Sequence, residues 1–60
     1  MILENYILTL KAQQIILEAR RDKARQYPLN TKLMIEAEMC EASIDALKKE
    51  IDKTQRALIT

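Results

Sequence analysis

The 60-residue chain contains no histidine, glycine, phenylalanine or tryptophan, and it has only one cysteine and one proline. Because Cys40 is alone, no disulfide can form within the chain, and the lack of histidine removes the usual zinc-binding spacings. Without glycine there is no glycine-rich phosphate loop, and no serine or cysteine stands beside a plausible general base. The sequence therefore predicts a protein that is not an enzyme and that holds no cofactor or metal.

Positive and negative charges nearly cancel, since ten lysines and arginines stand against nine aspartates and glutamates. This balance gives no strong preference for nucleic acid or acidic lipid. No apolar stretch approaches the roughly 18 residues of a membrane span, and Glu4 interrupts the apolar run that a signal peptide would need. We therefore expect a cytoplasmic protein with no membrane span, in which Cys40 stays reduced.

The single proline divides a chain that is otherwise rich in helix formers. A residue before proline is pushed toward extended conformations, so Tyr27 should end a first helix near Gln26. Beyond Pro28, Asn30 or Thr31 can cap a second helix by accepting a backbone N–H. The sequence predicts a single helical-hairpin domain over 1–60, with helices over about 2–26 and 31–58 and a connection over about 27–30.

Charged side chains gather on both sides of this break. The end of the first helix is basic and the start of the second is acidic, through Arg20, Arg21, Lys23 and Arg25, and through Glu36, Glu38 and Glu41. Each such charge complements the helix macrodipole by about 0.3–1 kcal/mol. A short connection makes the helices antiparallel neighbours, which brings the basic end beside the acidic start. The predicted fold is all-α, an antiparallel two-helix hairpin.

The second predicted helix carries two apolar stripes. One follows alternating steps of four and three residues, the heptad pattern of a seam between helices, and consists of Leu33, Ala37, Cys40, Ile44, Leu47, Ile51, Thr54 and Leu58. The other lies on roughly the opposite side of the helix and consists of Ile35, Met39, Ala42 and Ala46. On the seam, Cys40 is expected to act as a small hydrophobic residue.

The first predicted helix also carries two apolar stripes, about half a turn apart. One consists of Leu3, Tyr6, Ile7, Leu10, Leu17 and Ala24, and the other of Leu8, Ala12, Ile15, Ile16 and Ala19. A two-helix hairpin buries only one stripe from each helix, and exposed apolar patches mark association surfaces. We therefore expect oligomerisation or a partner protein to complete the hairpin.

The pattern alone does not decide which stripe of the first helix closes the hairpin. The small residues Ala12 and Ala19 suit close packing between the two helices, whereas Tyr6 can supply a binding hot spot. We therefore predict a partner-binding set made of Leu3, Tyr6, Ile7 and Leu10, extended on the second helix by Ile35 and Met39.

Two stretches resemble a known family. The first is Ile15-Ile16-Leu17, followed by Arg20 in a basic stretch. The second runs Gln26-Tyr27-x-x-Asn30-Thr31-x-Leu33 and continues to Glu38, Glu41 and Ile44. Together they cover about half of the chain and resemble small type III secretion proteins of the SsaE/YscE kind.

This resemblance implies a cytoplasmic helical hairpin that pairs with a tetratricopeptide-repeat co-chaperone. The two proteins together would hold the needle subunit unpolymerised before export, and the chain could self-associate when alone. Two alternatives stay open. One is a homodimeric four-helix bundle that binds RNA, as in plasmid proteins of the Rop kind, although the cations of the basic stretch point in several directions rather than along one face. The other is a small inhibitor of phage or plasmid origin.

Overall fold

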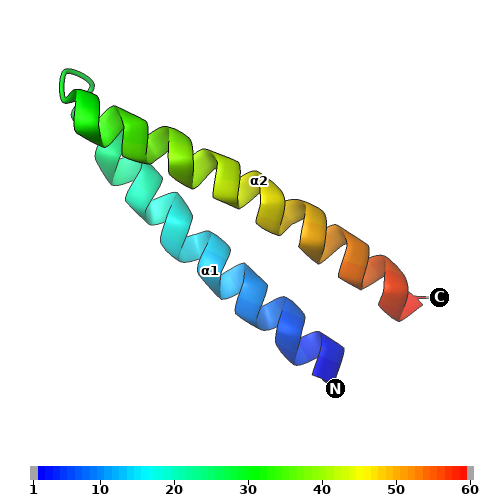
Figure 1. Ribbon diagram of the computed structural model, residues 1–60. Helices are drawn as coiled ribbons and strands as arrows, with labels where there is room; N and C mark the ends of the chain where they lie inside the picture. Colours follow the sequence, from blue (N-terminus) through cyan, green and yellow to red (C-terminus); the bar gives the residue numbers. More distant parts are fainter. Residues whose placement is uncertain (1, 60) are drawn as a thin grey trace.

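The computed structural model describes residues 2–59 and forms two long helices joined by a short turn. Helix α1 spans Ile2–Arg25 and helix α2 spans Thr31–Ile59. They run antiparallel along most of their length, with the turn at one end of the hairpin and both chain ends at the other (Figure 1). The expectation of an all-α two-helix hairpin is confirmed. Helix α1 ends one residue earlier than predicted and α2 extends one residue further; Met1 and Thr60 of the expected domain lie outside the described residues.

The backbone hydrogen bonds at the end of α1 become shorter in span before Pro28. The Gln26 N–H donates to the Lys23 carbonyl over 3.2 Å, and the Tyr27 N–H donates to the Ala24 carbonyl over 3.1 Å. Both bonds span three residues instead of four, which satisfies carbonyl groups that the last helical turn leaves without partners. The helix then stops, because the proline ring disfavours helical conformation in the residue before it.

The start of α2 is capped by Asn30, one of the two predicted caps. The Asn30 N–H donates to the Tyr27 carbonyl over 3.0 Å, which closes the turn. The Asn30 side-chain Oδ1 then accepts the Leu33 N–H over 3.1 Å, and the Asn30 carbonyl accepts the Met34 N–H over 3.0 Å. These bonds satisfy the first donors of α2, so the chain reverses direction without glycine.

The hairpin core is a single seam between the helices. On α2 it follows the predicted heptad, and the fully buried side chain of Ile44 lies at its middle. At the open end, Ile7, Leu10 and Ile51 form one cluster, against which Leu47 packs. Buried Thr54 donates its hydroxyl to the Glu50 carbonyl over 2.8 Å, so its polar atom has a partner inside the seam.

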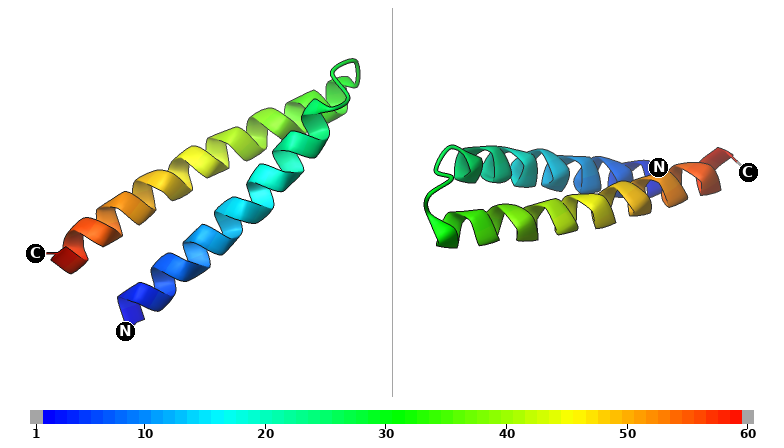
Figure 2. Two further views of the ribbon diagram at one scale, coloured as in Figure 1. Left: turned by 180° about the vertical axis from the view of Figure 1, so that it is seen from behind. Right: turned by 90° about the horizontal axis from the view of Figure 1, so that it is seen from above.

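The α1 side of the seam also has heptad spacing. Its members are Leu3, Ile7, Leu10, Gln14, Leu17, Arg21 and Ala24, which we call the α1 seam. Ile7, Leu10 and Ala24 are buried, and Gln14, Leu17 and Arg21 are partly buried. The helices separate toward the chain ends in one view and toward the turn in the perpendicular view, so they twist about each other (Figure 2). Such a twist keeps two heptad seams facing each other.

The prediction of which side of α1 faces α2 is wrong, and it misplaces two of the predicted binding residues. Ile7 and Leu10, assigned to a partner-binding surface, are only 6% exposed and close the hairpin. The residues expected inside, Leu8, Ile15 and Ile16, lie outside. The reason is that Ile7 and Leu10 belong to the heptad that faces α2, whereas Leu8 and Ile15 lie well around the helix from it.

Candidate protein-binding surfaces

The other predicted binding residues stay accessible. Leu3 and Tyr6 are partly exposed at the edge of the hairpin near its open end, whereas Ile35 and Met39 are 53% and 67% exposed on α2. The structure therefore does not bring the predicted set together on one surface. Ile35 and Met39 lie on the outer side of α2, and Tyr6 lies at the edge of α1. The other three belong to the α1 seam, where Leu3 is partly exposed and Ile7 and Leu10 are buried.

Tyr6 links the two helices at this edge. Its hydroxyl donates to Glu50 Oε1 over 3.3 Å. Partial desolvation of the ring, and then the nearby negative charge of Glu50 and its hydrogen bond, raise the pKa of the Tyr6 phenol above its ordinary value. Tyr6 therefore contacts α2, and its hydroxyl is already engaged within the hairpin.

Three large apolar side chains are exposed on the side of α1 that faces away from α2. Leu8, Ile15 and Ile16 are 63%, 66% and 60% exposed, and Ala12 and Ala19 are exposed between them. We call these five residues the α1 outer surface. Burying a Leu or Ile side chain contributes about 1.5–3 kcal/mol, so covering this surface would stabilise the protein substantially.

A second apolar stripe runs along the outer side of α2. It consists of Ile35, Met39, Ala42 and Ala46, all of them exposed, which we call the α2 outer surface. Its surroundings are acidic, because the segment 33–47 contains Glu36, Glu38, Glu41 and Asp45 and no lysine or arginine. The two outer surfaces therefore differ in charge as well as in position.

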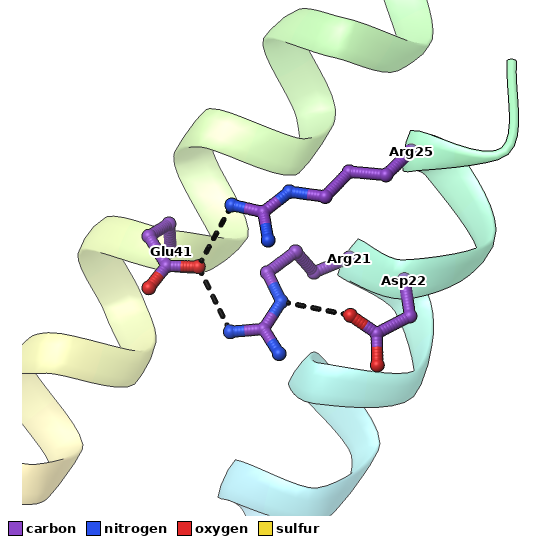
Figure 3. Close-up of polar contacts among 4 residues, drawn as sticks. All are labelled: Arg21, Asp22, Arg25 and Glu41. Carbon is purple, nitrogen blue, oxygen red and sulfur yellow. Dashed lines mark hydrogen bonds and ion pairs between the residues drawn. The ribbon is translucent and has the colours of Figure 1, made fainter. Parts of the chain in front are cut away.

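The basic end of α1 forms ion pairs with the acidic segment 33–47 of α2, as predicted. Arg21 Nη1 donates to Glu41 Oε2 over 2.9 Å and Arg25 Nη2 donates to the same oxygen over 3.3 Å. Glu41 thus reaches from α2 between two arginines of α1, while Asp22 accepts from Arg21 Nε (Figure 3). Hydrogen bonds to Glu41 and then to Asp22 raise the pKa of Arg21, which stays charged. Arg20 adds a longer contact of 4.0 Å to Glu36.

A hollow of about 490 Å³ lies at the open end of the hairpin. Apolar side chains from both helices line it, chiefly Ile7, Leu8, Leu58 and Ile59. Leu58 was expected on the seam, but it is partly exposed here. The hollow connects the α1 outer surface with the end of the seam.

Within residues 2–59, no three His, Cys, Asp or Glu side chains group closely enough to hold a metal ion. Cys40 is buried on the α2 side of the seam. Neither described helix has the length and apolar character to cross a membrane.

The sequence contained a signal for the correct inner face of α1. Unbroken steps of four and three residues connect Leu3 to Ala24, but two polar residues, Gln14 and Arg21, occupy seam positions. A search for purely apolar stripes passes over such a seam.

Comparison with protein-family models, with curated proteins and with solved structures finds no match to this chain.

Proposed function

We propose that this protein is a non-catalytic binding module that docks onto another protein through the α2 outer surface. The observation that carries the proposal is an exposed apolar stripe, from Ile35 to Ala46, inside a segment that contains only acidic charges. Glu38 and Asp45 carry the charge argument, because Glu36 and Glu41 already contact arginines of α1. A partner helix with an apolar face and with basic residues along the edge of that face would complement both the apolar stripe and its acidic charges. Ile35 and Met39 are the expected contact residues, and the flexible Met39 side chain can adapt to a partner.

We further propose that the partners are a tetratricopeptide-repeat co-chaperone and a type III secretion needle subunit, in the cytoplasm. The support is the resemblance of Ile15-Ile16-Leu17 and of the stretch that begins at Gln26-Tyr27 to small SsaE/YscE-like proteins. Burial of apolar surface would keep the needle subunit unpolymerised, and no chemical step is required.

The engaged arginines weigh against an RNA-binding function. Arg21 and Arg25 share Glu41, and Arg20 lies near Glu36. A phosphate-binding surface needs clustered positive potential, and these contacts offset much of it.

Co-expression with a tetratricopeptide-repeat co-chaperone and a type III secretion needle subunit tests the proposal. The parent chain should co-purify with both proteins, and the double variant I35K/M39K should lose them while it keeps its helicity, because both residues are exposed. The matched control Q55K adds a lysine at an exposed position outside the α2 outer surface and should bind as the parent does. If the I35K/M39K variant still binds both proteins, the α2 outer surface is excluded as the binding site. A parent chain that binds neither protein would exclude the secretion partners.

A further inference from the structure

The α1 outer surface has the residue spacing of an interhelical seam, although no helix covers it in the hairpin. Leu8, Ala12, Ile15 and Ala19 follow steps of four, three and four residues, and all four are exposed. Helices with this spacing pack against one another through knobs and holes. The pattern alternates large and small side chains, which restricts what can pack against it.

Side-chain size favours an antiparallel second copy of the same surface. When two copies of α1 run antiparallel about a two-fold axis between Gln13 and Gln14, Ile15 of each copy faces Ala12 of the other. In the same register, Leu8 faces Ala19. Large residues then fill the space beside small ones, as interdigitated packing requires. A parallel pair in register would instead place Ala12 against Ala12 and leave a gap.

Charge favours the same register independently. Four charged residues recur every seven positions along one edge of the α1 outer surface with alternating sign, namely Glu4, Lys11, Glu18 and Arg25. In the antiparallel pair, Lys11 of each copy lies across from Glu18 of the other, and Glu4 lies across from Arg25. Charges at such edge positions set the orientation of helix pairs. The two Lys11–Glu18 pairs carry this argument, because Arg25 already contacts Glu41 within the hairpin.

We propose that the protein forms a two-fold symmetric homodimer in which the α1 outer surfaces of two copies pack antiparallel. A closed interface of this kind uses the same patch on both subunits. The α2 outer surface is a poor match for a second copy, because its flanks would bring Glu38 and Asp45 near the same acids of the partner copy. The dimer therefore goes beyond the proposed function, and it leaves the α2 outer surface open to a different protein.

Charge reversal at Lys11 and Glu18 tests the interface and its orientation. By sedimentation equilibrium, the parent chain should be a dimer at micromolar concentration. K11E and E18K should each raise the dimer dissociation constant about tenfold or more, because each variant creates two like-charge pairs in place of two attractive ones. The double variant K11E/E18K should dimerise as the parent does. An equimolar mixture of the two single variants should form a mixed dimer, detected by a tag on one of them.

A control variant and a core variant complete the experiment. K53E reverses a charge on exposed Lys53 of α2 and should leave the dissociation constant unchanged. I15K should give a monomer of unchanged helicity by circular dichroism, because Ile15 lies outside the hairpin core. A monomeric parent chain, single variants that dimerise normally, or a mixture that forms no mixed dimer would each overturn the proposal. If a variant loses the dimer but still binds the secretion partners, or dimerises but no longer binds them, the dimer interface and the α2 outer surface are distinct binding sites.

Discussion

Arg21 of α1 and Glu41 of α2 form a 2.9 Å ion pair at the seam of the hairpin. The Arg21 side chain is only 16% exposed, so this charged group lies where a heptad normally places an apolar one. A second arginine, Arg25, contacts the same oxygen of Glu41. The pair can form only when α1 is rotated so that Arg21 faces α2.

Removal of the Glu41 charge is expected to destabilise the hairpin. The variant E41Q should melt at a lower temperature than the parent chain, because Arg21 and Arg25 lose their shared carboxylate. The matched control E38Q removes a carboxylate from an exposed position of the same helix and should change the melting temperature less. Thermal melts followed by circular dichroism provide the measurement. Added salt should narrow the difference, since it screens exposed charges. Equal melting temperatures for E41Q and E38Q at low salt would contradict this role of Glu41.

Truncation of Ile44 is expected to cost far more than truncation of an outer isoleucine. Ile44 is fully buried, so I44A should lower the free energy of unfolding by about 2–5 kcal/mol. That range rivals the whole stability of so small a domain. I35A removes the same atoms from the exposed side of α2 and should have little effect on folding. Urea denaturation of both variants tests the difference, and similar losses would show that the seam is misplaced.

The pH dependence of Tyr6 is expected to differ from that of an ordinary tyrosine. Its pKa is raised in the hairpin above the ordinary value for a tyrosine, so the folded state holds the phenol proton more tightly than the unfolded state. The resulting stabilisation is fully present below the ordinary pKa and is lost as the pH rises through the raised pKa. In a Y27F background, phenolate absorbance should give a midpoint above the ordinary pKa of a tyrosine. E50Q should move the midpoint back toward the ordinary value, and an unchanged midpoint would exclude the influence of Glu50.

The sequence allowed the turn and the inner face of α2 to be predicted, because their signals are local and unmixed. Pro28 ends α1, Asn30 caps α2, and the heptad through Ile44 carries no charged residue. The inner face of α1 could not be chosen in the same way. Its two stripes are similar in apolar content, and the longer heptad from Leu3 to Ala24 includes the polar residues Gln14 and Arg21. Apolar periodicity alone therefore leaves two rotations of the helix open.

Tertiary contacts decide between those rotations. A half turn of α1 would bring Ile15 into the seam, but it would also carry Arg21 away from Glu41 and Tyr6 away from Glu50. These contacts join residues that are distant in sequence, at separations of 20 and 44 positions. A helical wheel of α1 does not include α2, so it cannot reveal them. The same limit applies to the outer surfaces, which become visible only after the inner faces are known.

Gln14 provides a direct test of the α1 rotation. It lies on the α1 seam between Leu10 and Leu17 and is partly buried, whereas the neighbouring Gln13 is exposed. Replacing Gln14 with leucine should extend the apolar seam and raise the free energy of unfolding by about 1 kcal/mol. The matched variant Q13L adds the same side chain outside the seam and should give no comparable gain. Urea denaturation of the two variants decides the matter. If Q13L stabilised the protein as much as Q14L, α1 would have to be rotated relative to the hairpin described above.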